Sequence, residues 1–87
     1  MLDAVKRSLR MSNNSLDDDI IAQIEICKAD LKSGGAEYVD SDPLSQQAVF
    51  FYCRWQFDYL GKAEKWKLAY KELKIVLALR SEAETDE

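Results

Sequence analysis

The sequence predicts an all-α fold, a small bundle of three main helices with a short N-terminal helix packed beside them. Apolar residues recur at helical spacing in four segments, as they do in helices with one buried face. No segment alternates apolar and polar residues as a half-buried strand does. The 87 residues contain one proline and three glycines, and these stand where predicted helices begin or end.

The first two helices are predicted over residues 2–9 and 16–32. Leu2, Val5 and Leu9 form one apolar stripe on the first. Ser15 is the expected N-cap of the second, because a serine oxygen can accept from the free N–H groups of the first turn. Three aspartates follow it and meet the positive end of the helix dipole. The glycine pair after Ser33 ends this helix.

The third helix is predicted to run from Pro43 to Leu60, with Asp42 as its N-cap and Gly61 as its end. Apolar residues cover nearly its whole circumference, which is typical of a central helix or of one that another chain also covers. We expect the core to include Leu44, Ala48, Phe51, Trp55, Tyr59 and, from the next helix, Trp66.

The fourth helix is predicted over residues 62–79. Leu68, Ile75 and Leu79 lie opposite its main apolar stripe, where a single subunit would leave them exposed. A line of three such residues favours a contact surface for self-association, although scattered surface leucines are also ordinary. We therefore predict one domain over residues 1–79, followed by an acidic, flexible tail over residues 80–87.

Composition excludes several classes of function. The formal net charge of −4 argues against a protein whose main role is to grip nucleic acid phosphates. No apolar run approaches the roughly 18–20 residues that cross a bilayer, so no membrane partner is expected. The chain has no histidine and no recognisable catalytic motif, so we expect neither an enzyme nor a cofactor or metal site.

Two other features each allow a functional and an ordinary interpretation. Cys27 and Cys53 lie among apolar neighbours, which favours buried, reduced thiols over reactive ones. The five lysines of the fourth helix could contact DNA. The interspersed Glu64 and Glu72 favour a solvated face instead.

Four stretches carry a family resemblance: "MLDAVKRSLR", "LDDDIIAQIEICKADLKSGG", "DPLSQQAVFFYCRWQFDYLGKAEKW" and "AYKELKIVLAL". Together they cover nearly the whole chain, in order and at the expected spacing. With them the chain resembles the small head–tail connector proteins of long-tailed bacteriophages and prophages, which are also described as phage DNA-packaging proteins.

The resemblance implies a structural subunit with no catalysis and no cofactor. Such proteins form a homo-oligomeric ring below the portal protein once the genome is packaged. The ring extends the DNA channel and offers a platform for the next connector or tail-completion protein. Viral DNA passes through without being held tightly. The implied location is the head–tail junction of the virion, and the host cytoplasm during assembly. A subunit that is monomeric before assembly is compatible with this role.

Two groups of contact residues are expected. The subunit-interface candidates are Leu68, Lys71, Glu72, Ile75 and Leu79. The candidates for contact with the portal or another partner are Tyr38 and Val39 of the loop and Arg80, Glu82 and Glu84 of the tail. Two alternative functions stay open: a small helical adaptor or regulator that binds a single protein partner, and a weak DNA-binding regulator.

Overall fold

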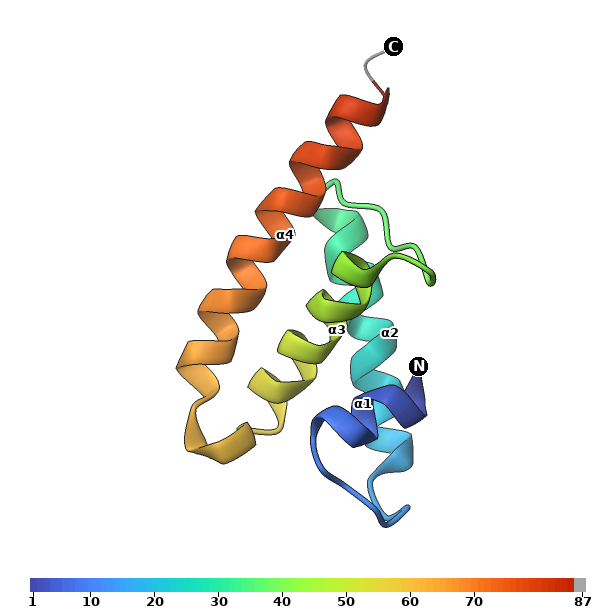
Figure 1. Ribbon diagram of the computed structural model, residues 1–87, viewed down its shortest axis with the longest axis vertical. Helices are drawn as coiled ribbons and strands as arrows, with labels where there is room; N and C mark the ends of the chain where they lie inside the picture. The colour runs from blue at the N-terminus through green and yellow to red at the C-terminus, as the bar shows by residue number, and fades with distance from the viewer. Residues whose placement is uncertain (86–87) are drawn as a thin grey trace.

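The computed structural model describes the backbone of residues 1–85 and the side chains of residues 1–83. Within these residues the chain forms helices and no strand, which confirms the predicted all-α class. The elements are α1 (Leu2–Ser8), α2 (Asp17–Ser33), α3 (Pro43–Gln56), the 3-10 turn η1 (Tyr59–Gly61) and α4 (Ala63–Thr85) (Figure 1).

Helix α3 is the centre of the bundle, because it contacts α1, α2 and α4. Figure 1 shows α2 and α4 on opposite sides of it, with α1 across the lower end of α2. The last turns of α4 extend beyond the end of α2. This central position accounts for the apolar residues around nearly the whole circumference of α3, since α1, α2 and α4 cover different parts of it.

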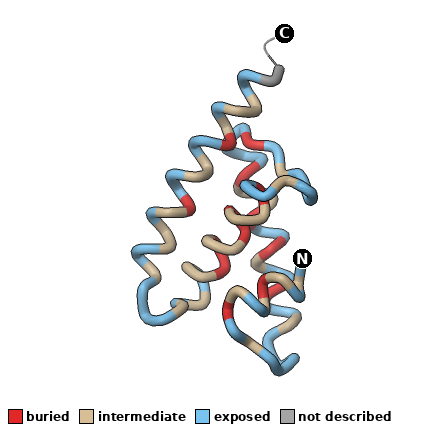
Figure 2. The backbone as a smooth tube through the Cα atoms, viewed as in Figure 1, coloured by how far each residue is buried: buried red, intermediate tan, exposed pale blue. Residues whose placement is uncertain are grey.

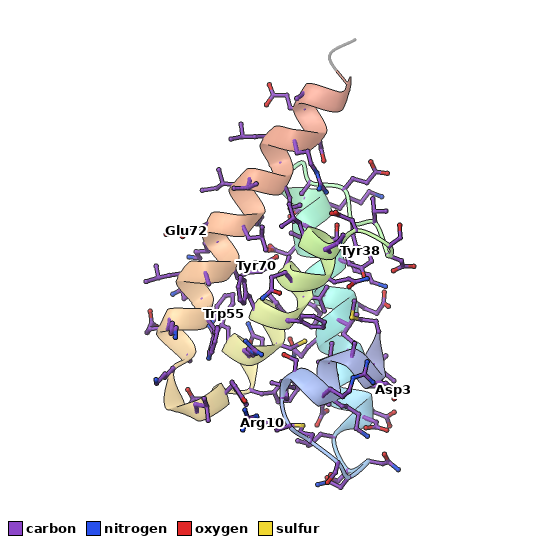
Figure 3. The ribbon with its side chains drawn as sticks, in the orientation of Figure 1. Asp3, Arg10, Tyr38, Trp55, Tyr70 and Glu72 are labelled. Atoms are coloured by element: carbon purple, nitrogen blue, oxygen red, sulfur yellow. The ribbon has the colours of Figure 1, made fainter. Side chains whose placement is uncertain are left out.

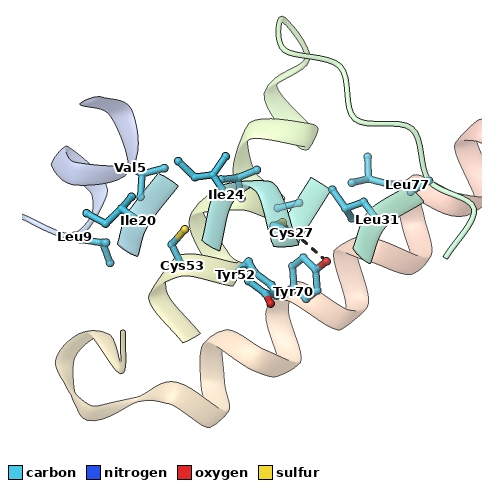
Figure 4. Packing of buried hydrophobic residues seen from close by; sticks show 13 residues of the cluster. Val5, Leu9, Ile20, Ile24, Cys27, Leu31, Tyr52, Cys53, Tyr70 and Leu77 are labelled. Atoms are coloured by element: carbon cyan, nitrogen blue, oxygen red, sulfur yellow. Dashed lines mark hydrogen bonds between the residues drawn. The ribbon is translucent and has the colours of Figure 1, made fainter. Parts of the chain in front are cut away.

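The core is one continuous cluster that runs the length of the bundle. Buried positions follow the inner faces of α1, α2 and α3 and one line of α4 (Figure 2). Figure 4 shows the cluster at close range. Its largest fully buried side chains are Tyr70, Ile20, Leu31, Leu77, Val5 and Val49.

Two helix boundaries follow from local chemistry as predicted. The carboxylate of Asp42 accepts a hydrogen bond from the N–H of Ser45 at 3.1 Å, so Asp42 caps α3, and Pro43 stands directly after it. At the end of α2, Gly35 has a φ of +86°. The N–H of Ala36 then donates back to Leu31 at 2.9 Å, which is the bond of a Schellman C-cap.

Two predicted helix boundaries are wrong. Ser15 does not cap α2, since Leu16 holds the N-cap position and the Ser15 hydroxyl donates to Asn13 instead. Helix α3 ends at Gln56 rather than Leu60, because Asp58 takes a left-handed conformation. The Asp58 carboxylate accepts from the N–H of Ala63 at 3.1 Å, so it serves the start of α4 instead of continuing α3.

The predicted end of the fourth helix at Leu79 is also wrong, because α4 continues to Thr85. Most of the supposed tail is therefore helical, and residues 86–87 lie outside the described residues. The continuation has a tertiary cause. The Ser81 hydroxyl accepts from the N–H of Glu37, and the Arg80 guanidinium contacts Asp42 at 2.6 Å, so the loop before α3 holds this part of α4.

The predicted core residues lie at three levels of burial. Ala48 is fully buried, and Phe51, Trp55 and Tyr59 are partly buried against the core. Trp66 is partly buried, and its ring lies 5.9 Å from that of Phe51. Leu44 is a correction: its side chain is 41% exposed because it lies on the outer side of the first turn of α3, whose inner side carries the fully buried Ser45.

Candidate interaction surface

The outer face of α4 carries the largest exposed apolar line on the bundle's helices. Leu68, Ile75 and Leu79 are each 60% exposed. They follow the spacing i, i+7, i+11, which places them along one side of the helix. Val76 lies beside this line and is 50% exposed. We call Leu68, Ile75, Val76 and Leu79 the α4 face.

Charged residues border the α4 face. Lys71 and Glu72 are both exposed, as expected of interface candidates beside the apolar line. Figure 3 shows Glu72 on the outer side of α4, and Tyr70 on the side that meets the bundle. One helix thus presents a core face and an apolar outer face, and its largely exposed outer side chains contribute little to the stability of the subunit that carries them.

A polar cluster fixes the middle of α4 against α2. The Tyr70 hydroxyl donates to the carboxylate of Asp30 at 2.6 Å, and the Lys74 ammonium donates to the same oxygen at 3.0 Å. Partial burial works to raise the pKa of Asp30, but the bonds from Tyr70 and Lys74 outweigh it and hold that pKa below its usual value. Burial, with the Asp30 carboxylate beside it, raises the pKa of the Tyr70 hydroxyl.

A second polar joint holds the upper part of α4 against the start of α3. The Arg80 guanidinium lies 2.6 Å from the Asp42 carboxylate, which also accepts from the N–H and the hydroxyl of Ser45. The bond from Arg80, supported by those from Ser45, holds the pKa of Asp42 well below its usual range. With its middle and its upper part both fixed, α4 presents its outer face on a rigid element.

The structure places the predicted partner-contact residues of α4 in different settings. Arg80 belongs to the joint with Asp42, so its charge already serves the fold. Glu82 is exposed on α4, one turn beyond Leu79. Glu84 belongs to α4 by its backbone, and its side chain lies outside the described residues.

The two loop candidates, Tyr38 and Val39, lie in the segment between the end of α2 and the start of α3. Tyr38 is partly buried beneath Lys28, whose ammonium is 4.9 Å from the ring centre. Burial raises the pKa of the Tyr38 hydroxyl to about 12, and the neighbouring Asp40 carboxylate adds to this effect. Val39 is exposed, and its backbone N–H donates to the buried Ser45 hydroxyl at 3.2 Å. Figure 3 shows Tyr38 on the other side of the bundle from Glu72 and the outer side of α4.

The aromatic residues near η1 form a stack around a cation. The Arg54 guanidinium lies 4.7 Å from the ring of Trp66 and 5.2 Å from the ring of Tyr59. The Trp66 indole N–H donates to the Tyr59 carbonyl at 3.1 Å, which ties the turn to the start of α4. These contacts give Tyr59 and Trp66 a role in packing the turn against α3 and α4.

Two observations on the described residues concern metal binding and the reactivity of the thiols. No group of three or more carboxylate or thiol side chains gathers there in a way that could hold a metal ion. Cys27 and Cys53 are fully buried, and burial raises the pKa of each thiol to about 12, so neither is a ready nucleophile. The Cys27 thiol instead faces the Tyr70 hydroxyl at 3.9 Å (Figure 4). No helix of the described chain is sufficiently long and apolar to span a bilayer.

Sequence reasoning predicted Leu68, Ile75 and Leu79 of the α4 face but missed Val76 and both polar joints. Asp42 was identified as a cap, yet nothing in the sequence pairs it with Arg80, 38 residues away. Likewise, Asp30 and Tyr70 each fit their own helix pattern, and only the packing of α2 on α4 brings them together. Such pairs depend on tertiary geometry, for which a single sequence carries no local signal.

Comparison with known proteins identifies no relative. No protein-family model, no curated protein and no solved structure matches the chain.

Proposed function

We propose that this chain is a structural assembly subunit that joins copies of itself into a ring and acts as a head–tail connector. In this role the ring lies below the portal protein, extends the DNA channel and joins the filled head to the next connector or tail-completion protein. The observation that carries the proposal is the α4 face, an exposed apolar line on a helix that two internal polar joints hold rigid. The family resemblance supplies the setting in the virion.

The size of the α4 face sets the strength of the proposed contact. Burying a large aliphatic side chain stabilises by about 1.5–3 kcal/mol, so covering four half-exposed ones gains several kcal/mol. Association of two proteins costs roughly 4–15 kcal/mol in lost freedom and ordering. One such contact is therefore weak. A closed ring gives every subunit two contacts, and a portal that gathers subunits raises their effective concentration. These magnitudes support a subunit that is monomeric before assembly and joins a ring where a portal gathers its copies.

The placement of the lysines favours the structural role over DNA binding. Lys67 lies over the ring of Trp55 at 5.8 Å, and Lys74 pairs with Asp30 at 3.0 Å. Lys65 likewise lies 5.0 Å from the ring centre of Trp66, so three of the five lysines of this segment contribute to the fold. Together with a net charge of −4, this leaves little basic surface for phosphates, as suits a subunit through which DNA only passes.

The direct test adds the purified protein to DNA-filled heads that lack it. We expect the heads to bind the protein and to become able to join tails. Heads that neither bind it nor gain tail-joining would refute the proposal.

The α4 face is tested separately with Leu68→Asp combined with Ile75→Asp. Because both side chains are exposed, the variant should keep its helical circular dichroism but fail to assemble on heads. Leu44→Asp combined with Leu60→Asp is the matched control, since it places the same charges on exposed apolar positions away from the α4 face. If the variant with Leu68→Asp and Ile75→Asp still assembles, the α4 face is not part of the interface. That result would not by itself contradict the connector role.

A further inference from the structure

We infer that the α4 face of one copy packs antiparallel on the outer face of α2 in a neighbouring copy. This inference rests on the proposed self-association and names the second surface that it requires. A head-to-tail contact joins two different patches and closes into a ring when the rotation between copies permits. Figure 1 shows α4 and α2 on opposite sides of α3, so one subunit can offer both patches at once.

The apolar positions of the two helices match in spacing. On α4, Leu68 and Ile75 protrude seven residues apart, which is close to two helical turns. On the outer face of α2, Ala22 and Ala29 are exposed at the same separation. Their small side chains leave room for large ones from a neighbour. Between them Ile26 is 48% exposed and adds apolar area to the contact.

The charges beside these positions match only when the helices run antiparallel. One edge of α4 carries Glu64 and Lys71, and the corresponding edge of α2 carries Glu25 and Lys32. Antiparallel helices that pack face to face bring corresponding edges together. When Leu68 lies on Ala29 and Ile75 on Ala22, Lys32 comes beside Glu64, and Glu25 comes beside Lys71. This alignment forms two opposite-charge pairs across the contact.

The parallel alignment is less favourable. It would bring the Glu64 edge of α4 against the other edge of α2, where Asp19 lies level with it. Like charges juxtaposed at an interface work against the wrong pairing. Charge therefore selects the antiparallel arrangement, while the apolar spacing alone would allow both.

The four charged groups are available for such a contact. In the described subunit, Glu64, Lys71 and Lys32 are exposed and form no ion pair. Glu25 is 68% exposed and lies 3.7 Å from Lys28, a loose surface pair. Assembly would therefore break no internal joint.

Cysteine cross-linking tests this geometry. A chain that carries both Ala22→Cys and Ile75→Cys is bound to DNA-filled heads at high protein concentration. The sample is then oxidised. Cys27 and Cys53 are fully buried and should not react. We expect a ladder of covalent multimers from the double variant, dimers from a mixture of the two single variants, and monomers from each single variant alone.

Two outcomes overturn the inference. Dimers of the Ile75→Cys chain alone would show that α4 of one copy meets α4 of another. Self-association would then still hold, but α2 would not be the surface that α4 contacts. The absence of a ladder from the double variant, on heads that bind it, would show that α4 and α2 of neighbouring copies do not meet.

Charge reversal provides an independent test. Lys71→Glu should weaken assembly about tenfold, because it faces Glu25 with a like charge. Adding Glu25→Lys to the same chain should restore assembly. In the matched control, Glu25→Lys is combined with Lys65→Glu, which lies on the opposite edge of α4. The new lysine at position 25 then faces Lys71 with a like charge, so assembly should stay weak. Failure of Glu25→Lys to rescue Lys71→Glu, or equal rescue in the control, would contradict the predicted pairing.

Discussion

At the scale of single residues, Tyr70 connects the core to the polar cluster between α2 and α4. Its ring is buried against Tyr52, with ring centres 5.1 Å apart, and its hydroxyl reaches the Asp30 carboxylate. The aromatic body contributes apolar burial, while the hydroxyl satisfies a carboxylate that the packing brings close. The position of α4 thus depends on Tyr70, which both packs in the core and bonds to Asp30 of α2.

Removing the Tyr70 hydroxyl should destabilise the subunit. Tyr70→Phe keeps the ring but takes one of two donors from Asp30, so we expect a loss of about 1–2 kcal/mol in the free energy of unfolding. Urea denaturation followed by circular dichroism measures it. Tyr52→Phe is the control, because the Tyr52 hydroxyl bonds to no group in the described chain and its loss should cost under about 0.5 kcal/mol. Equal losses in both variants would contradict a specific role for the Tyr70–Asp30 bond.

At the scale of elements, the joint between Asp42 and Arg80 links the start of α3 to the upper part of α4. A single carboxylate caps one helix and binds a cation from another. Its position explains why α4 runs past Leu79 and why the loop before α3 is held in place.

The Asp42 joint should make stability fall in acid. The folded state holds the pKa of Asp42 below its unfolded value, so the stabilisation is complete above the usual carboxyl pKa of about 4 and is lost as the pH falls below it. Asp42→Asn keeps a good N-cap but loses the charge that Arg80 binds. We expect the wild type to be more stable than this variant at neutral pH, and the difference to shrink in acid.

Urea denaturation of both chains from neutral pH down to about pH 2.5 measures this difference. Asp3→Asn, at an exposed position of α1, is the control for loss of one carboxylate. A difference between wild type and Asp42→Asn that stays constant over the whole range would contradict the role of the Asp42 charge.

The two faces of α4 should respond oppositely to truncation. Leu77 is fully buried, so Leu77→Ala should cost about 2–5 kcal/mol of folding stability through lost burial and the cavity left behind. Leu79 lies two residues further on and is 60% exposed, so Leu79→Ala should change stability by less than about 0.5 kcal/mol while weakening assembly. Thermal or urea denaturation of the two variants checks the contrast. A large stability loss from Leu79→Ala would mean that the residue packs within the subunit.

Helix periodicity predicted the elements, while their ends depended on contacts distant in sequence. The number and order of helices, the Asp42 cap and the exposed line on α4 all follow from local spacing. The end of α3 did not, because Asp58 adopts a left-handed conformation and caps α4. Leu44 fits the core stripe by angle, yet its side of the first turn of α3 is left 41% exposed, while Ser45 beside it is fully buried. Angular position alone cannot show where along a helix the packing stops.

At the scale of the whole molecule, the residues that hold the subunit together differ from those that it offers to other molecules. The core, the Tyr70 cluster and the Asp42 joint fix the helices relative to one another. The α4 face and the outer face of α2 contribute little to that stability, and the two helices flank α3. This arrangement fits a subunit that folds alone and assembles by adding identical contacts.

Electron cryomicroscopy of DNA-filled heads incubated with the purified protein tests the central claim most directly. The account predicts a closed ring of copies below the portal, with α4 of each copy at the boundary with its neighbour. The Leu68→Asp, Ile75→Asp variant should leave the same heads without a ring. Heads on which the wild-type protein adds no density, or binds only as isolated copies, would contradict the account.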